Sequence, residues 1–523
     1  MSEQKDIDAR HRARALAKLR LELAKDIEGA ARIAESSGLS DLLRLCYLLR
    51  IGRIVLIAPT LRKKLSISDV AQLELREEAL KYAIGLIAKH GTWREDAFAS
   101  MLLDDVSSER IDKLEYFARH INAKFELEGA LQIGKVRVLG DRDQDCYIDL
   151  ESGFLDPQRS FYFHYGLRIE RSTSRSKEHA LPVPDLARRF LEDYFDVSDL
   201  FEAQCGISLE AFCRGLFELD NVLRARFQAV ETVLSNNGTR RIYPNEARTF
   251  AAISRAMYFT DDELESAFGA EFVSYLRINA FDPSVANATE LRFHYLTRRP
   301  FLMGRGFAIL SPELFLDSVL HNSHFALLEG ADSKVPYMNA GASRFLDRVA
   351  TLAASHGYSE VEREVFLKEG KRDIGDIDLV LFNKVKRHTL LIECKNHSLP
   401  LDVYFRSVEG IDAHVARNRS WEQKVERRIS HLRTGSASCT IDGLWDYIVV
   451  SLMPEPLSHL ANVLILSLDE FEMWLSQDPR DKSFVQFFEH IYKPEESNMS
   501  VEEMERMQQE GFILGRPSHD FPP

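Results

Sequence analysis

The residues best suited to chemistry lie in one stretch of the chain, from Asp373 to Lys395. Two short apolar runs within it, residues 378–382 and 389–392, are rich in strand formers and are joined by a polar, basic connection. This pattern predicts a β-hairpin whose ends carry acidic and basic side chains. The expected chemistry depends on which of those side chains share a face.

Side chains at the end of the second strand are expected to form an acidic and basic pair. Alternate residues of a strand point to the same face, so Glu393 and Lys395 project together. Ile392 and Cys394 are expected to face the opposite, packed layer. If the first strand begins at Asp378, two carboxylates and one ammonium group converge at one end of the sheet.

Carboxylates placed this closely repel one another, and a hard metal ion is one of the usual ways to stabilise them. Mg²⁺ or Mn²⁺ suits the set, because Mg²⁺ binds oxygen ligands, keeps several waters and is often held by a small number of carboxylates together with phosphate oxygens. The backbone carbonyl of Cys394 is a candidate further ligand. A lysine beside the ion can orient a water and offset the charge of the attacked phosphate, so Lys395 points to phosphodiester hydrolysis.

At these residues the chain resembles the PD-(D/E)xK superfamily, the restriction-endonuclease-like nucleases. The family pattern is a strand-initial Asp followed by Glu-x-Lys at the end of the next strand, and it matches Gly375-Asp-Ile-Asp378 and Glu393-Cys-Lys395. The resemblance implies that Asp378 and Glu393 ligate the metal ion and that Lys395 orients the attacking water.

The resemblance leaves the choice of some side chains open. The literal Pro-Asp of the family name is absent, so Asp376 is an alternative or auxiliary acid to Asp378. Asp347 is the candidate acid of the preceding helix, although a solvent-facing carboxylate is the competing interpretation. Gln423 and Lys424, on a later helix, are auxiliary candidates for contact with the scissile phosphate.

The elements expected around the hairpin follow the αβββαβ order of that superfamily, which implies an α/β domain with a mixed sheet over residues 336–490. Before the hairpin, the pattern predicts a helix over 343–355 and a strand over 359–366. After it we expect a helix over about 408–432, buried strands over 447–452 and 463–466, and a helix capped by Asp469.

A basic balance surrounds this acidic motif. Residues 384–434 hold eleven Lys and Arg against six Asp and Glu, a local balance of +5 in a chain whose net charge is −14. Phosphate binding rests on Lys and Arg, so Arg427 and Arg428 are candidate nucleic-acid contacts. A solvated helix face would carry the same charges, and the sequence does not separate the two interpretations.

Composition bounds the class of protein. The chain has 523 residues, of which 45% are hydrophobic and 28% charged, which is ordinary for globular proteins and enough for about three domains. Six cysteines without a Cys-x-x-Cys pair predict neither a zinc site nor a disulfide framework. The polar N-terminus and the lack of a long apolar run predict no signal peptide, no membrane span and a cytoplasmic location.

The chain before the α/β domain is expected to be a mainly helical α+β region. We predict a helical domain over residues 1–124, an α+β region over 125–335 with a boundary near 330–341, and a peripheral tail over 491–523. Strands are expected at 135–139, 146–150, 161–169, 291–296 and 307–310, and capping boxes at 260–263 and 500–503. The apolar stripes of the helices are candidates for homo-oligomer contacts.

These observations predict a metal-dependent nuclease that hydrolyses phosphodiester bonds, with Mg²⁺ or Mn²⁺ as cofactor and DNA as the expected partner. By analogy, the layout suggests a bacterial restriction or anti-phage defence effector whose N-terminal part directs or restrains the nuclease. Two alternatives stay open. One is a catalytically idle module of the same fold that binds nucleic acid or protein, and the other is a nuclease that acts on RNA.

Overall fold

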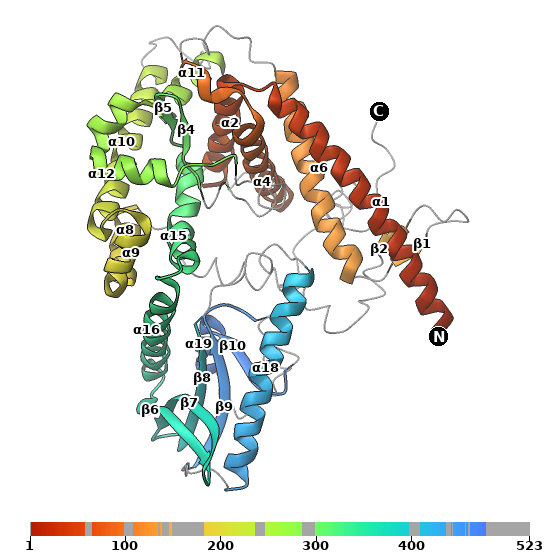
Figure 1. The fold of residues 1–523 in the computed structure, drawn as a ribbon, viewed down its shortest axis with the longest axis vertical. Coiled ribbons are helices and arrows are strands. Elements are labelled where there is room, and N and C mark those ends of the chain that lie inside the picture. Colours follow the sequence, from red (N-terminus) through yellow and green to blue (C-terminus); the bar gives the residue numbers. More distant parts are fainter. Residues whose placement is uncertain are drawn as a thin grey trace.

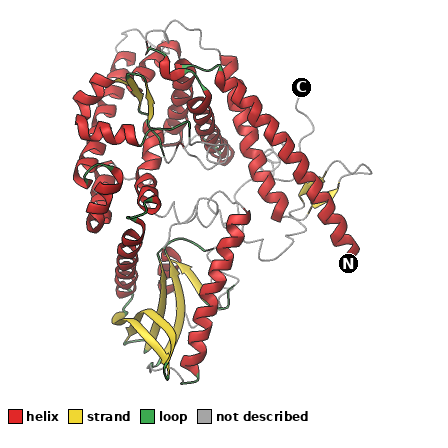
Figure 2. Cartoon of the chain, viewed as in Figure 1, coloured by secondary structure: helices red, strands yellow, loops and turns green. Residues whose placement is uncertain are grey.

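The computed structural model shows a helical N-terminal part and a smaller C-terminal part built on a five-stranded sheet (Figure 1). Figure 2 separates the two by secondary structure, with the long strands gathered in the C-terminal part. The described residues are 2–57, 65–98, 108–133, 136–138, 146–148, 183–235, 246–284, 296, 299–396, 408–435, 441, 443–455, 457–458 and 461–476. Within these ranges no helix is long and apolar enough to cross a membrane.

The N-terminal part is mainly helical, as predicted. Its longer helices are α1 (Ser2–Glu35), α2 (Leu39–Ile57), α4 (Ile67–His90), α6 (Ser108–Ile133), α8 (Val183–Tyr194), α10 (Leu209–Ser235), α11 (Glu246–Met257), α12 (Asp261–Ile278) and α15 (Pro312–Glu329). Its shorter ones are η1 (Trp93–Glu95), η3 (Phe195–Val197) and α9 (Ser198–Cys205). Buried apolar side chains between Leu23 and Leu327 form one cluster, so the regions expected at 1–124 and 125–335 share a hydrophobic core.

Short strands interrupt these helices. β1 (Val136–Val138) pairs with β2 (Cys146–Ile148), and β5 (Phe307–Ile309) lies between β3 (Tyr258–Thr260) and β4 (Leu302–Gly304). These confirm three of the expected strands, and the capping box at 260–263 is present at the start of α12. The expected strand at 161–169, the capping box at 500–503 and the tail at 491–523 lie outside the described residues, as does the strand at 291–296 apart from Leu296, which is helical.

The expected boundary at 124/125 falls inside a helix, whereas the one near 330–341 lies between Leu327, the last buried residue of the N-terminal cluster, and Phe345, the first of the sheet clusters. α6 crosses position 124/125, and α16 (Lys334–Ser355) begins within the segment 330–341 where the second boundary is expected. Only a short turn separates α15 from α16, and the Ser333 hydroxyl donates to the Leu327 carbonyl across it at 2.8 Å. The Gly, Ser and Pro residues that indicated the boundary build this turn and the first turn of α16, where proline is tolerated.

The C-terminal sheet has the strand order β10-β9-β8-β7-β6. β6 (Ser359–Glu369), β7 (Arg372–Asn383) and β8 (His388–Lys395) are antiparallel neighbours, whereas β9 (Leu444–Ser451) is parallel to β8 and β10 (Leu464–Ser467) is parallel to β9. The predicted hairpin is therefore confirmed as β7 and β8, and the sheet is mixed. β8 is central and its apolar run 389–392 is buried, as is usual for strands covered on both faces.

Helices cover both faces of this sheet (Figure 1). α16 and α19 (Leu468–Ser476) pack on one face, and α18 (Val408–Arg433) packs on the other through Trp421 and Val425. The start of α19 differs from the prediction, because the N-cap is Ser467 and not Asp469. Ser467 and Glu470 exchange side-chain to backbone hydrogen bonds of 3.3 and 2.8 Å.

Side chains of β8 alternate between these two helical layers. Leu390 and Ile392 pack in the cluster beneath α16, and Leu391 packs in the cluster beneath α18. The alternation places Glu393 on the α18 side of the sheet. Cys394 packs against the α16 cluster, as the sequence predicts.

β7 begins earlier than the predicted start at Asp378. The motif residues Gly375 and Asp376 therefore lie inside the strand, next to a bulge. The pairing of β6 with β7 shifts register between Leu367 and Lys368, which oppose Gly375 and Asp373. Gly375 has a φ of 125°, a conformation that glycine adopts far more readily than other residues. The chain reverses instead at Gly370, where φ is 60°.

Candidate active site

β7 and β8 separate where the predicted acidic residues lie. Their ladder ends at the pair Leu379 and Ile392, whereas β8 continues to pair with β9 as far as Lys395. Just past the end of the ladder, the Asp378 carboxylate accepts a hydrogen bond of 2.6 Å from the Cys394 N–H. The carboxylate takes the place of a strand-to-strand hydrogen bond and is held at the point of separation.

A local irregularity in β7 re-aims Asp378. Ile377 packs in the α18 cluster and Leu379 packs in the α16 cluster, although residues two apart in a regular strand share a face. On the neighbouring strand, Glu364 has a φ of 52°, so β6 is irregular at the same level. Both strands are thus irregular at the level of Asp378, although the register of their pairing does not shift there.

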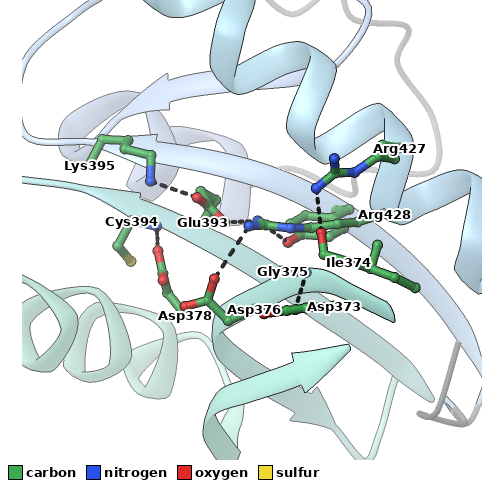
Figure 3. Close-up of polar contacts among 11 residues, drawn as sticks. Asp373, Ile374, Gly375, Asp376, Asp378, Glu393, Cys394, Lys395, Arg427 and Arg428 are labelled. Carbon is green, nitrogen blue, oxygen red and sulfur yellow. Dashed lines mark hydrogen bonds and ion pairs between the residues drawn. The ribbon is translucent and has the colours of Figure 1, made fainter. Parts of the chain in front are cut away.

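Glu393 is the most enclosed acid of the group, with 6% of the residue exposed. One of its carboxylate oxygens accepts from the Lys395 ammonium group at 2.6 Å, and the other is ion paired with the Arg428 guanidinium (Figure 3). A buried carboxylate without a partner is strongly unfavourable, and these two cations offset its charge. The structure therefore brings Glu393 and Lys395 together beside Asp378, as predicted.

Arg428 reaches this group from α18 and is only 5% exposed. Besides Glu393, it donates to the Tyr447 hydroxyl at 3.1 Å and to the Asp376 carboxylate at 3.4 Å. The backbone of β7 passes close by, because a Cβ added to Gly375 would lie 2.7 Å from two of the guanidinium nitrogens. Glycine at this position leaves the room that the guanidinium occupies.

The two candidate acids of β7 have different surroundings. Burial raises the pKa of Asp378 to about 6, the negative charge of Glu393 adds to this rise, and Lys395 opposes it. Asp376 has a side chain that is 45% exposed, and its ion pair with Arg428 is long at 3.4 Å. Asp378 is therefore the acid held beside Glu393, and Asp376 lies at the rim.

The donor set fits a metal ion that takes few protein ligands. Within the described part of the chain, no group of three or more His, Cys, Asp or Glu side chains is arranged to hold a metal ion. Asp378 and Glu393 supply two carboxylates, and the Cys394 carbonyl is the predicted third oxygen. Mg²⁺ completes such a set with waters and phosphate oxygens, whereas zinc and calcium sites use more protein ligands.

Comparison with known proteins adds no relative. No family model, curated protein or solved structure matches the chain. What the site can do therefore follows from its own residues, which are two acids, a lysine and a buried arginine at one end of a sheet.

Three of the auxiliary residues lie outside this group. Asp347 is exposed on α16 and forms an ion pair of 2.7 Å with Arg363. Gln423 and Lys424 are exposed on α18. No contact described in the structure joins any of the three to Asp378 or Glu393, so their auxiliary roles stay predictions.

The two arginines predicted to contact nucleic acid have different environments. Arg427 is exposed and donates to the Ile374 carbonyl at 2.6 Å. Arg428 is buried among carboxylates, because its charge is needed to offset Glu393. In this structure Arg427 is therefore exposed for a phosphate contact, whereas Arg428 is engaged by Glu393.

Tyr447 belongs to the site, although the sequence pattern predicts only that it lies in a buried strand. Its hydroxyl needs a partner once it is buried, and Arg428 provides one. A signal for Arg428 is present in the sequence, since Trp421, Val425 and Arg428 are spaced by four and three residues on one side of a helix. A charged residue on an apolar stripe indicates a buried partner of opposite charge.

We expect Asp378→Asn to stabilise the protein near neutral pH in the presence of EDTA. The folded protein disfavours the ionised carboxylate, so this cost is absent below about pH 3.8, grows towards about pH 6 and is complete above it. Asparagine removes the charge and keeps an oxygen for the Cys394 N–H. The gain should be roughly 1–3 kcal/mol, measured from the unfolding midpoint.

A control variant, measured over the same range of pH, tests this prediction. Glu362→Gln changes an exposed acid of β6 and should shift stability by less than about 0.5 kcal/mol at every pH. A lower midpoint for Asp378→Asn near neutral pH would mean that the ionised carboxylate is favourably held. A gain that persists unchanged to about pH 4 would also contradict the titration of Asp378.

Gly375→Ala should destabilise the protein by about 1–3 kcal/mol, because it combines an unfavourable φ with a contact on Arg428. Gly370→Ala is the matched control, since Gly370 also has a positive φ but an added Cβ meets nothing within 4 Å. Thermal unfolding of both variants measures the difference. An equal loss in the two would show that Arg428 moves aside without cost.

Proposed function

We propose that the protein is a metal-dependent nuclease that hydrolyses phosphodiester bonds. The observation that carries the proposal is the meeting of Asp378, Glu393 and Lys395 where β7 and β8 separate. Two carboxylates can hold a divalent ion, and an amine beside them can act on a phosphate and a water. These are the groups that metal-assisted phosphodiester hydrolysis requires.

The order of elements supports a restriction-endonuclease-like fold for this part of the chain. From α16 to β9 the order is helix, three strands, helix, strand, which corresponds to αβββαβ, and β10 and α19 follow. The sheet is mixed and lies between helices on both faces. The acids sit on the second and third of these strands, in agreement with the resemblance in the sequence motif.

Each residue of the site has a distinct task in this proposal. Asp378 and Glu393 hold Mg²⁺ or Mn²⁺ together with the Cys394 carbonyl, and the bound ion supplies Lewis-acid polarisation and a water of lowered pKa. Lys395, whose side chain is 24% exposed beside Glu393, orients the attacking water and offsets the charge that develops on the phosphate. Asp376 acts from the rim as an auxiliary acid.

Nucleic acid is the proposed partner, with DNA as the substrate. Arg427 supports a phosphate contact, because it is exposed on the same helix that delivers Arg428 to the site. A setting in bacterial restriction or anti-phage defence, a cytoplasmic location and homo-oligomer contacts through the N-terminal helices complete the proposal. These parts rest on the resemblance and the sequence pattern.

One observation favours a second candidate, a module of the same fold that binds without cleaving. Both oxygens of Glu393 are engaged by cations of the chain itself. If that arrangement were permanent, Glu393 would offer no oxygen to a metal ion. Cleavage that depends on Mg²⁺ or Mn²⁺ would exclude this candidate.

Purified protein should cleave plasmid or linear DNA with Mg²⁺ or Mn²⁺ and should not cleave with EDTA. Asp378→Ala, Glu393→Ala and Lys395→Ala should each lower the rate about 100-fold or more, because a lost ligand or water-orienting amine removes roughly 3 kcal/mol of transition-state stabilisation. Asp376→Ala should have a smaller effect. Single-stranded DNA and RNA, assayed in parallel, identify the preferred substrate.

Controls make the cleavage result decisive. Glu362→Ala removes an exposed acid of β6 and should cleave at the wild-type rate, and thermal unfolding should show that every variant is folded. Full activity in Glu393→Ala would contradict the assignment of Glu393 as a metal ligand. If Asp376→Ala abolishes cleavage and Asp378→Ala does not, Asp376 is the ligand. Binding of nucleic acid without cleavage of any substrate would support the idle module.

Arg427→Gln should weaken nucleic-acid binding equally for all sequences and reduce the slope of log affinity against log salt by about one unit. Fluorescence anisotropy in EDTA, over a series of salt concentrations, measures both quantities. Lys384→Gln is the matched control, because it removes one exposed positive charge at the turn between β7 and β8. A slope that does not change in Arg427→Gln would place this face of α18 away from the nucleic acid.

A further inference from the structure

We propose that Arg428 closes the site as an internal counter-ion, and that a divalent ion binds when the guanidinium releases Glu393. The arrangement seen here, with the two side chains ion paired, is called the closed state. In the open state the guanidinium takes a phosphate oxygen of the nucleic acid as its new acceptor. This inference rests on the proposed function, because it describes how that site is regulated.

Glu393 has no free oxygen for a metal ion in the closed state. Lys395 holds one oxygen at 2.6 Å and Arg428 holds the other. A metal ligand has to direct an oxygen lone pair at the ion, and a hydrogen bond from a cation occupies that direction. One of the two cations therefore has to move before Glu393 can act as a ligand.

Arg428 is the cation that competes with a metal ion for Glu393. Its guanidinium contacts Glu393 on β8 and Asp376 on β7, so it joins acids of the two strands (Figure 3). Lys395 contacts Glu393 from the same strand and lies two residues away from it in the chain. The lysine thus stays beside Glu393 in both states, and the arginine leaves.

Formal charges of the group support this exchange. With three ionised acids, Asp376, Asp378 and Glu393, against Lys395 and Arg428, the closed state has a balance of −1. Without the guanidinium the balance is −2, which a divalent ion neutralises. A guanidinium and a divalent ion at the same carboxylates would repel each other, so each excludes the other.

The hydrogen bonds of the Arg428 guanidinium are not all satisfied in the closed state. Its Nε–H is buried without a hydrogen-bond partner among the described residues, and its bond to Asp376 is long at 3.4 Å. A planar guanidinium binds best to an acceptor with two adjacent oxygens, and a phosphate provides them. Glu393 offers the guanidinium only one oxygen, because Lys395 holds the other, whereas a nucleic-acid phosphate offers two.

Metal ion and nucleic acid favour the same open state in this scheme. The ion takes the oxygen that Arg428 leaves, and the phosphate takes the guanidinium. Two ligands that favour one state increase each other's affinity by the same factor. The substrate class that opens the site is thus a phosphodiester, and its partner in opening is a divalent cation.

The test is the Mn²⁺ affinity of the full-length protein without nucleic acid, measured by isothermal titration calorimetry or by electron paramagnetic resonance of free Mn²⁺. Arg428→Gln should bind Mn²⁺ about tenfold tighter than wild type or more, because the internal competitor is gone. Arg428→Lys keeps a charge but not the planar fork, so a smaller gain is expected. It also covers the case in which Arg428→Gln does not fold.

Arg427→Gln is the matched control, since it makes the same charge change at the next residue and Arg427 contacts a backbone carbonyl. Its Mn²⁺ affinity should stay within about twofold of wild type, because the exposed charge is screened. Cleavage by Arg428→Gln should fall about tenfold or more in spite of tighter metal binding, since the phosphate contact is lost. A side chain that only braced Glu393 would not raise metal affinity while it lowered the rate.

The outcomes separate this inference from the function on which it rests. Equal or weaker Mn²⁺ binding by the Arg428 variants would overturn the role of Arg428 as an internal counter-ion. Cleavage by the wild type would still leave the nuclease proposal standing. An equal gain in Mn²⁺ affinity in Arg427→Gln would reveal a general effect of charge and would also overturn the role of Arg428 as an internal counter-ion. If neither the wild type nor any variant binds Mn²⁺, the proposed function is overturned, and so is the role of Arg428 as an internal counter-ion.

Discussion

A carboxylate buried at the end of a strand has to be neutralised, and this requirement connects the sheet to α18. Glu393 is 6% exposed, and removing an unpaired carboxylate from water is very unfavourable. One partner is local, because Lys395 lies two residues along β8. The other has to be delivered by a different element, and Arg428 follows Glu393 by 35 positions. The bulge of β7 follows from the same need, since any side chain at Gly375 would occupy the place of the guanidinium.

α18 is held along its length by a second set of buried polar contacts. His414 and Asn418 both contact one oxygen of Glu455, at 2.7 and 2.8 Å, and Glu422 accepts the Asn462 N–H. These three helix residues are spaced by four, so they lie on one side of α18 and contact the segment between β9 and β10. Apolar packing tolerates small shifts of a helix, whereas buried hydrogen-bonded groups have a defined register. The polar contacts therefore determine where along the sheet Arg428 enters.

Local patterns in the sequence predict the strands and helices of this part well, because each carries its own signal. Alternation in the hairpin is enough to place Glu393 and Lys395 on one face. Contacts between distant segments are a different matter. The apolar stripe with Trp421 and Val425 indicates that Arg428 is buried, but nothing in the helix itself identifies Glu393 as the partner across the sheet. The residues at 330–341 also show how one local pattern fits two structures, since Gly, Ser and Pro mark a boundary between regions and equally build the tight turn found there between two helices.

Internal neutralisation has opposite consequences for stability and for chemistry. In the closed state Glu393 has partners without any bound ligand, so the part of the chain that carries it can fold before a metal ion arrives. The same ion pair removes the oxygen that a metal ion needs. If Arg428 acts as proposed, opening leaves Asp378 and Glu393 repelling each other until a dication neutralises them, and it leaves the guanidinium without an acceptor until a phosphate arrives. Each ligand alone relieves only part of this cost, so activity requires both, and the dependence originates in the charges of the site itself.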